Sequence, residues 1–393
     1  MAADRPAATV VGGGIAGLAA AISLAYAGWR VTVLERAPVL GEIGAGLAIT
    51  ANGMTALAAL GLDGAVSKAG YQTVVAGFQD TAGRWLMRLP DSAGAVATLW
   101  GLQRQRLHAV LRRAAEAADG VELQAGAEVV DVRPGAPDGT LAAVTWRTAS
   151  ATHTADAELV VAADGVRSAV RALLFPAVRP SYSGSTSWRA VISDTATDGR
   201  LVQAWGPHTE FGSLRVSDTE IYWYGYFRNP EGAVFADELS AARERFANWA
   251  PWVRGLVAAT PADRLMRHDV YHLRQGLPAY VRGRVVFAGD AAHAVLPSSG
   301  QGAATALEDG VCVGRMIAAP VLAGDSLVAA LAAYDRARRP RCARIARTGV
   351  MVARTGADLG GGWRQSVRNA FLRIMPAAPL LKAGEPIVRW SAP

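Results

Sequence analysis

Two glycine-rich stretches of this sequence have residue types and spacings suited to chemistry on a phosphorylated ligand. The first, GGGIAG, supplies the pattern G-x-G-x-x-G at Gly12, Gly14 and Gly17. The second, GDAAHAVLPSSGQG, covers residues 289–302 and carries an aspartate, a histidine and a proline ahead of a helix-like segment. Most of the chain separates the two stretches, so any ligand that they share must be brought to both by the fold.

The first stretch lies between a short apolar run, residues 8–11, and a helix-like run, residues 14–28. A β-branched run, residues 30–35, follows and ends in an acidic residue, Glu35. This order predicts a β-α-β unit at the N-terminus, which is the context in which the glycine pattern indicates dinucleotide binding. We therefore predict that one dinucleotide is held, with one end at each glycine-rich stretch.

Each residue of this motif has a physical task. Gly12 permits a tight turn, Gly14 lets a pyrophosphate approach the backbone, and Gly17 lets helix and strand pack closely. Ala16 lies in the first helical turn, where unpaired N–H groups and the helix dipole favour phosphate. We expect the Glu35 carboxylate to accept hydrogen bonds from ribose hydroxyls.

The second stretch follows another buried-strand pattern and has its own binding groups. Asp290 lies where ligands of parallel sheets bind, and its carboxylate can accept from sugar-like hydroxyls. Pro297 fixes the backbone, and we expect its carbonyl to point toward the ligand. The run 298–302 offers consecutive N–H groups before a helix that starts near Ala303, which suits an electron-rich edge. His293 is either a general base or a structural histidine, and the sequence leaves both readings open.

A third short motif, DGVRSAVR, places Asp164 and Gly165 after the apolar run 157–163. An aspartate at this point is either a ligand group or a simple turn cap. From Tyr182 to Tyr226 aromatic residues alternate with small or polar ones, which predicts a sheet with one ligand-facing or solvated side. A helix is expected over residues 102–118, and helices finish the chain.

The bulk composition bounds the function. The chain has 393 residues, of which 51% are hydrophobic and 19% charged, as in a compact enzyme. Its net charge is +7, but the arginines are spread along the chain, so we expect no nucleic-acid partner. Two cysteines make neither a disulfide framework nor a zinc site, and no metal is expected. No export signal or membrane span is expected, which predicts a cytoplasmic protein.

Taken together, GGGIAGLAAAISLAYAGWRVTVLE (12–35), DGVRSAVR (164–171) and GDAAHAVLPSSGQGAATALED (289–309) resemble the class A flavoprotein monooxygenases, the single-component FAD-dependent aromatic hydroxylases. LQRQRL (102–107) is similar to the arginine-bearing helix start of that family, and YSGSTSWRAV (182–191) to the opening of its substrate sheet. The resemblance spans nearly the whole chain.

The resemblance implies an α/β fold: a Rossmann-like FAD-binding domain with an inserted antiparallel substrate sheet and C-terminal helices. The expected boundaries are residues 1–178 for the first part of the FAD-binding domain and 179–276 for the substrate-binding sheet. Residues 277–335 return to the FAD-binding domain, and residues 336–393 form a helical segment. A monomer or a homodimer is expected.

The resemblance also assigns site residues. The cofactor-binding set that it implies is Gly12, Gly14, Ala16, Gly17, Glu35, Arg36, Arg104, Val129, Asp164, Asp290, Pro297, Gly300, Gln301 and Gly302. The substrate set is Arg189, Glu210, Tyr222 and Tyr224. Pro297, Tyr222 and Tyr224 are the expected catalytic residues. Alternation along a strand puts Tyr222 and Tyr224 on one face and Trp223 on the other.

The implied reaction reduces FAD with NAD(P)H and transfers oxygen from a flavin C4a-hydroperoxide to an aromatic or heteroaromatic substrate. An acid at position 210 disfavours an anionic substrate and suits a neutral phenol, indole, quinolone or alkene. Epoxidation or Baeyer–Villiger oxygen insertion on the same scaffold is the alternative, and a flavoprotein reductase that does not oxygenate is a further one. The substrate itself and the choice of NADH or NADPH stay open.

Overall fold

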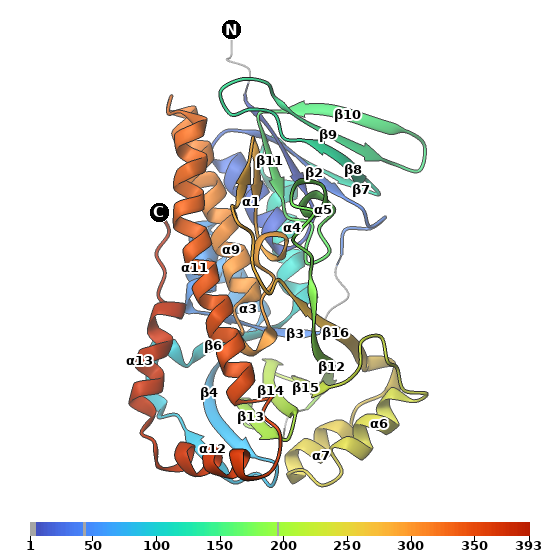
Figure 1. Cartoon of the computed structure of the whole chain (residues 1–393), viewed down its shortest axis with the longest axis vertical. Helices are drawn as coiled ribbons and strands as arrows, with labels where there is room; N and C mark the ends of the chain where they lie inside the picture. The colour runs from blue at the N-terminus through green and yellow to red at the C-terminus, as the bar shows by residue number, and fades with distance from the viewer. Residues whose placement is uncertain (1–4, 42–44, 195) are drawn as a thin grey trace.

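Two sheets lie at opposite ends of the molecule and are connected by long helices (Figure 1). The computed structural model describes residues 5–41, 45–194 and 196–393. In this described part, a six-stranded sheet has the order β17-β18-β11-β1-β2-β7. Its strands are β1 (Ala7–Val11), β2 (Arg30–Glu35), β7 (Val121–Ala125), β11 (Leu159–Ala162), β17 (Val281–Arg282) and β18 (Val285–Phe287).

The centre of this sheet is parallel and buried on both faces. β1 pairs in parallel with β2 and β11, and β11 with β18. All four residues of β11 are buried, because α1 (Ile15–Tyr26) covers one face of the sheet and a three-stranded sheet packs against the other. The predicted β-α-β unit and the predicted end of its second strand at Glu35 are thus confirmed. A three-stranded sheet lies beside it, formed by β8 (Glu128–Arg133), β9 (Ala142–Arg147) and β10 (Thr152–Ala157).

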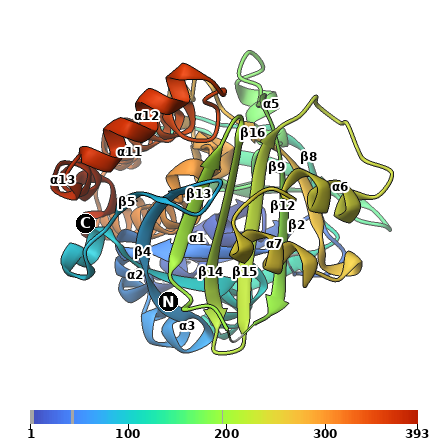
Figure 2. The same ribbon diagram turned by 90° about the horizontal axis from the view of Figure 1, so that it is seen from below.

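The larger sheet has the order β16-β12-β15-β14-β13-β4-β6-β3, with β5 paired to β4. Its strands are β3 (Gly46–Thr50), β4 (Tyr71–Asp80), β5 (Trp85–Arg88), β6 (Thr98–Gln103), β12 (Ser181–Ser193), β13 (Leu201–Gly206), β14 (Thr209–Ser217), β15 (Glu220–Arg228) and β16 (Met266–His272). Its pairs are antiparallel except β13 with β4. Figure 2 shows α6 (Glu238–Arg245) and α7 (Pro251–Ala258) lying across its outer face.

Side-chain alternation distinguishes the outer face of the larger sheet from its inner face. Trp188, Trp223 and Phe227 pack with α6 and α7 in one buried cluster. Tyr222 belongs to a different buried cluster on the opposite, inner face. The inner face is therefore directed toward the smaller sheet, as the period-two pattern predicts.

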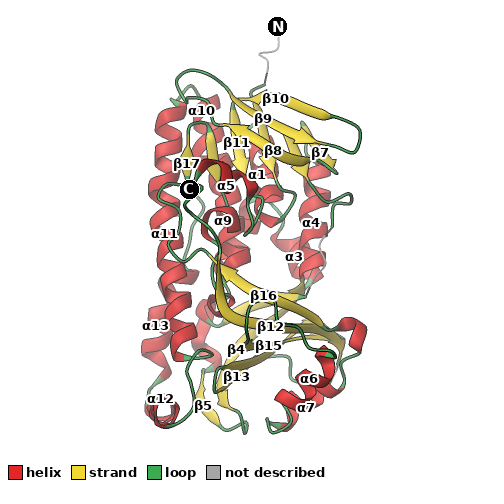
Figure 3. Cartoon of the chain, turned by 45° about the vertical axis from the view of Figure 1, so that its right-hand side comes forward, coloured by secondary structure: helices red, strands yellow, loops and turns green. Residues whose placement is uncertain are grey.

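The helices that cover the two sheets come from three parts of the chain. They are α1 (Ile15–Tyr26), α2 (Ala51–Ala59), α3 (Asp63–Ala69), α4 (Arg104–Ala117), α5 (Ala169–Leu174), α8 (Asp290–His293), α9 (Gly302–Cys312), α10 (Ala319–Leu322), α11 (Leu327–Thr355), α12 (Trp363–Ile374) and α13 (Ala377–Val388). Short turns of other helix types are η1 (Asp91–Val96), η2 (Ala262–Arg264), η3 (Pro297–Ser299) and the π-helical η4 (Val313–Ala318). Figure 3 shows α11 running along one side of the molecule from the smaller sheet to the larger one.

Small residues bring α9 against α1. A Cβ atom on Gly310 would lie 2.5 Å from the Ala19 Cβ, and one on Gly314 would lie 2.0 Å from the Ser23 hydroxyl oxygen. Gly310 lies in α9 and Gly314 in the adjoining η4, and both segments approach α1 so closely only because glycine has no side chain at these points. This contact joins the N-terminal motif to the segment that follows the second motif.

Three expectations need correction or comment. The helix expected over residues 102–118 begins two residues later, because Leu102 and Gln103 pair with β3 as the end of β6. The larger sheet is not confined to residues 179–276, since β3 to β6 lie in it. The boundary at residue 335 falls inside α11. Apart from these observations, the domain boundaries stay a prediction. Among the described helices, none combines the length and apolar character needed to cross a membrane.

Candidate active site

The three sequence motifs meet at one edge of the smaller sheet. β1, β11 and β18 are parallel neighbours, so the residues that follow them emerge side by side. Gly12 follows β1 with φ +106°, and a Cβ atom there would lie 2.5 Å from the Ala163 carbonyl oxygen. A Cβ atom on Gly289 would lie 2.8 Å from the Ala16 Cβ. The two glycine-rich stretches are therefore in direct contact, as one shared ligand requires.

The first turn of α1 is prepared for an anion. No side chain caps this helix, although Ile15 and Ala16 are buried. Uncapped N–H groups at a buried helix start need another acceptor, and a pyrophosphate supplies one. The Glu35 carboxylate accepts the Gly13 N–H at 2.7 Å and the Ala37 N–H at 2.9 Å. Each of its oxygens keeps a lone pair for a ribose hydroxyl.

Asp164 precedes α5 and accepts hydrogen bonds from the start of that helix. Its carboxylate oxygens accept the Ser168 hydroxyl at 2.5 Å and the Val170 N–H at 3.1 Å. Burial raises the pKa of Asp164, although these hydrogen bonds oppose the shift. The turn-cap reading of this aspartate is thus supported by its contacts, and a cofactor contact stays a prediction. Arg171, from the same motif, donates to the Ala291 carbonyl at 3.0 Å and so holds the second motif in place.

Asp290 differs from Asp164 in being exposed. It begins α8, and none of the described residues donates a hydrogen bond to its carboxylate. A carboxylate that is free at the ligand edge of a parallel sheet is suited to sugar-like hydroxyls. Gly300 lies in the left-handed region with φ +62°, and its Cα faces open space.

The proline-led turn closes on its own first residue. The Pro297 carbonyl accepts the Gly300 N–H at 2.8 Å within η3, which leaves one lone pair of this oxygen for a ligand, and its orientation toward the ligand stays a prediction. A three-residue turn of this kind closes on its first carbonyl. α9 then starts at Gly302 without a side-chain cap, which leaves its N-terminal N–H groups available to a ligand. A catalytic role for Pro297 stays a prediction.

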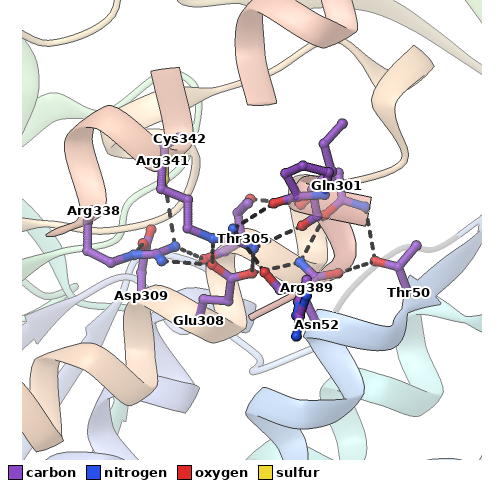
Figure 4. A network of polar contacts seen from close by, with 12 residues as sticks. Thr50, Asn52, Gln301, Thr305, Glu308, Asp309, Arg338, Arg341, Cys342 and Arg389 are labelled. Carbon is purple, nitrogen blue, oxygen red and sulfur yellow. Dashed lines mark hydrogen bonds and ion pairs between the residues drawn. The ribbon is translucent and has the colours of Figure 1, made fainter. Parts of the chain in front are cut away.

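The Gln301 side chain points away from this opening and into a buried polar network (Figure 4). Its Nε2 donates to the Thr50 hydroxyl at 3.0 Å, and its Oε1 accepts from Asn52 Nδ2 at 2.9 Å. Asn52 Nδ2 also lies 2.7 Å from Glu308 Oε1. Glu308 in turn pairs with Arg338 at 2.7 Å. Only the Gln301 backbone therefore remains for a flavin edge.

The same network extends to the other end of the second motif. Asp309 accepts the Arg338 guanidinium at 2.7 Å with one oxygen, and the Gly289 N–H at 2.8 Å with the other. The second oxygen also lies 2.5 Å from His293 Nε2. A chain of buried contacts thus joins Gln301 to Gly289, the two ends of the second glycine-rich stretch.

His293, Asp309 and Cys342 bring their potential ligand atoms within 4.8 Å of one another. Burial raises the pKa of Asp309, but His293 and Arg338 outweigh it and lower that pKa to about 2. Burial lowers the pKa of His293, but the neighbouring Cys342 and Asp309 raise it well above its usual value. Arg338 pairs with both Glu308 and Asp309, and His293 lies among these buried contacts behind the loop. Both roles of His293, structural and catalytic, stay predictions.

Three other predicted cofactor residues lie around the same edge. Arg36 follows β2 and is exposed, and Arg104 is the exposed first residue of α4. Val129 lies in β8, two residues after Ala127, whose N–H donates to the Glu35 carbonyl at 2.8 Å. Arg36 and Val129 are thus both near the Glu35 end, and their contacts with a cofactor stay predictions.

The predicted substrate residues share the inner face of the larger sheet. Arg189 of β12 is directly opposite Tyr224 of β15, and both side chains are half-buried. Tyr222 is buried, and its ring leaves space only for a glycine at position 46, where a Cβ atom would lie 2.3 Å from Tyr222 Cγ. The prediction that Tyr222 and Tyr224 face away from Trp223 is confirmed.

Glu210 is buried on this face in a hydrogen-bonded set that the sequence did not indicate. It accepts Tyr224 Oη at 2.7 Å and Gln203 Nε2 at 2.6 Å. The Trp205 indole N–H is close enough to favour the ionised carboxylate but makes no hydrogen bond of normal geometry. Burial outweighs these contacts and raises the pKa of Glu210.

Comparison with known proteins decides the family. A family described as an FAD binding domain matches residues 5–348. The chain is 35% identical over 338 residues to aurachin C monooxygenase/isomerase of Stigmatella aurantiaca, and the match covers 84% of this chain and 85% of that protein. The chain belongs to the class A FAD-dependent monooxygenases.

Further comparisons support the same family and fold for this monooxygenase. It is 31% identical over 379 residues to 2-heptyl-3-hydroxy-4(1H)-quinolone synthase of Pseudomonas aeruginosa, with 94% of each chain covered. Klebsiella pneumoniae HpxO, solved with FAD and uric acid, shares the fold with a TM-score of 0.82 and 22% identity, covering 98% of this chain and 96% of that one. The predicted fold class and FAD cofactor are confirmed.

The cradle of this monooxygenase fits FAD. It combines an uncapped helix start, a glycine turn without room for a side chain, and a free carboxylate at one sheet edge. The sequence did not indicate three residues that contact predicted site residues. Asn52 bonds to Gln301, Gln203 bonds to Glu210, and Trp205 lies close to Glu210. Their only signal is that a polar or indole side chain sits inside an apolar pattern, and many core residues do the same.

Proposed function

We propose that this monooxygenase uses NAD(P)H and O2 to hydroxylate a neutral heteroaromatic molecule of the 4-quinolone class. Atoms balance when the substrate C–H, O2, NAD(P)H and one proton give the hydroxylated product, NAD(P)+ and water. The two sequence relatives described above are named for aurachin C and for a 3-hydroxy-4(1H)-quinolone, which supports this class.

The observation that carries the proposal is the pairing of a donor with an acceptor on the inner face. Arg189 lies directly opposite Tyr224 in the β12–β15 ladder. Its guanidinium can donate to a ring carbonyl. The Tyr224 hydroxyl donates to Glu210 and accepts from Gln203 Nε2 at 2.8 Å, so its oxygen keeps one lone pair for a substrate N–H. A 4-quinolone carries its N–H and its carbonyl on opposite sides of one ring, which matches such a pair.

The same contacts prepare the substrate for oxygen transfer. A group that accepts the ring N–H pushes electron density toward the carbon beside the carbonyl, which makes that carbon nucleophilic. Burial raises the pKa of Tyr224 well above its usual value, with Glu210 adding to the effect. Tyr224 therefore stays a neutral phenol. It orients the substrate N–H without placing a negative charge beside the substrate.

FAD, when bound, supplies the electron transfer and the activation of oxygen. The protein supplies position and exclusion of water. Leu214, Val216 and Tyr222 form a buried apolar cluster on the inner face, which keeps water away from the reacting atoms.

Mass spectrometry tests the proposal. The FAD-loaded protein is incubated with NADH or NADPH, 18O2 and a panel of 2-alkyl-4-quinolones, indoles, phenols and salicylate. We expect one 18O atom in a hydroxylated quinolone, and loss of most of this product in Tyr224→Phe but not in the exposed control Tyr26→Phe. Oxygen inserted into a ring, or oxygen consumed only as peroxide with every compound, contradicts the proposal.

A further inference from the structure

α12 exposes an apolar stripe on the outside of the molecule. Trp363, Val367, Phe371 and Ile374 are exposed by 72%, 60%, 55% and 81%. Their spacing of four, four and three residues puts all four on one face of a helix with 3.6 residues per turn. Isolated exposed apolar residues are ordinary, but a continuous stripe marks an interaction surface.

The surroundings of this stripe are basic. Residues 336–393 contain 12 arginines and lysines but two acidic residues, Asp358 and Glu385. The segment therefore carries +10 (12 − 2). Four of its arginines pair with four carboxylates outside it, Glu308, Asp309, Asp335 and Asp80, which leaves +6 (10 − 4). Arg364 is exposed next to Trp363 on α12, and Arg347 is exposed on the neighbouring part of α11. Among the described residues, neither arginine has a carboxylate partner.

The opposite side of α12 is fixed to the protein. Arg368 Nη1 donates to the Thr355 carbonyl, and its guanidinium lies 5.1 Å from the centre of the Trp205 ring. Arg373 Nη2 donates to Asp80 at 3.0 Å. α12 lies at the far end of the molecule from the smaller sheet, as Figure 1 shows. The stripe is therefore held outward by contacts of its own helix and is free to meet a flat surface.

We propose that the α12 face docks on an anionic lipid bilayer. An apolar stripe with Trp and Phe, bordered by arginines, is the pattern of a helix that lies in a membrane interface. The charge of the C-terminal segment complements anionic headgroups. A second copy of this chain fits less well, because pairing two such faces would bring the basic segments of both copies together. The contact is a surface attachment and needs no membrane span.

A cavity near the stripe gives this docking a use, and this step rests on the proposed function. The cavity is about 520 Å3 and is lined by His208, Arg354, Asp358, Trp363 and Arg364, among others. Ala357, which precedes the lining residue Asp358, packs with Tyr226 in one buried cluster, and the Leu359 carbonyl accepts the His208 N–H at 3.0 Å, so this cavity lies near the inner sheet face. Docking would thus place an opening close to that face at the membrane surface, where alkylated substrates dissolve.

Vesicle co-sedimentation of the FAD-loaded full chain tests the docking. The vesicles are phosphatidylcholine alone, or phosphatidylcholine with about one third phosphatidylglycerol. We expect binding to the anionic vesicles that is weakened by salt, and at least about tenfold weaker binding for Trp363→Ser/Phe371→Ser. The matched control is Val39→Ser/Val234→Ser, whose side chains are 74% and 72% exposed elsewhere. Visible absorbance verifies that every variant retains FAD.

Three results overturn the docking proposal. One is equal binding of the wild type and the α12 variant. Another is the absence of binding to anionic vesicles. The third is a dimer in analytical ultracentrifugation that the α12 variant dissociates, which assigns the stripe to a second copy. Because no substrate is used, these outcomes are independent of the quinolone proposal.

Discussion

The Asn52 side-chain amide donates a hydrogen bond to Gln301 from 249 positions away in the sequence, at 2.9 Å. The same nitrogen lies 2.7 Å from Glu308. Asn52 thus links the loop that is predicted to hold the flavin edge to the ion pairs behind it. Few other side chains could do this, because a buried carboxylate and a buried amide oxygen both need donors here.

Replacement of Asn52 by leucine should destabilise the loop. It leaves the Gln301 and Glu308 oxygens without this donor, and each unsatisfied group costs about 1–3 kcal/mol. We expect a lower free energy of unfolding in urea, together with a shifted flavin reduction potential, because the N–H groups at the start of α9 lose their fixed direction. The control is Asn369→Leu on α12, which is half-buried and accepts from the neighbouring Arg368. An unchanged potential with lower stability would limit Asn52 to a structural role.

Asp290→Ala should lose FAD. The exposed carboxylate accepts no hydrogen bond from the described residues. Its removal should therefore lower the stability of the apoprotein little and that of the FAD complex more. We expect an FAD dissociation constant raised by at least about tenfold, which corresponds to about 1.4 kcal/mol. Fluorescence titration of the apoprotein measures it, with the exposed Asp325→Ala just before α11 as the control. A variant that purifies with full yellow colour contradicts the assignment of Asp290 to the cofactor.

Alanine substitutions at two helical glycines should change the stability of the protein in opposite directions. Gly310→Ala puts a methyl group 2.5 Å from the Ala19 Cβ and forces α9 away from α1, at a cost of about 1–3 kcal/mol. Gly255→Ala in α7 meets no atom within 4 Å and should stabilise by up to about 1 kcal/mol. Thermal unfolding of the apoproteins compares them. Equal effects would show that the α1–α9 contact relaxes without cost.

Asp309→Asn should change the response to acid. The pKa of Asp309 is lowered to about 2 in the folded protein, from 3.8, because His293 and Arg338 outweigh burial. A depressed pKa contributes stability above about pH 4 that is lost as the pH falls toward about 2. The variant should therefore lose about 1–3 kcal/mol at neutral pH, where Arg338 keeps Glu308 but loses one of its two carboxylate partners, and show a flatter decline in acid. Urea unfolding across this range measures both, and Asp263→Asn, an exposed site, should match the wild type.

Glu210→Gln should affect stability at high pH, whereas Asp309→Asn affects its loss at low pH. Burial raises the pKa of Glu210, so its contribution to stability is present at low pH and lost as the pH rises through the raised value. The glutamine variant should unfold like the wild type at acid pH and be more stable than it at mildly alkaline pH, as urea unfolding measures. A variant with the wild-type pH dependence would show that the carboxylate is well solvated by its neighbours.

The sequence predicted the smaller sheet well because glycine turns and buried parallel strands have strong local patterns. Gly12, Glu35 and Asp290 could be placed from spacing alone, since each follows or ends a strand in a β-α-β order. The start of α4 was misplaced because Leu102 and Gln103 have helical neighbours, and only their pairing with β3 makes them a strand.

The polar groups that hold the site could not be predicted in the same way. Asn52 contacts Gln301 and Glu308 from 249 and 256 positions away, and no local pattern encodes such a contact. The hydrogen bond from the Gly300 N–H to the Pro297 carbonyl was not predicted either, because the turn type depends on Gly300 three residues on. The substrate face was predicted by alternation, whereas the Gln203 partner of Glu210 comes from another strand.

The contact between α1 and α9 has a consequence for synthesis. One half of the FAD cradle is made near the start of the chain, but Gly289, Gly310 and Arg338 complete it near the end. While the ribosome is still adding those residues, the nascent N-terminal unit has its phosphate-binding turn and lacks the helix that covers it. Contacts of such long sequence separation form slowly. We therefore expect flavin capture to follow the packing of α9 against α1.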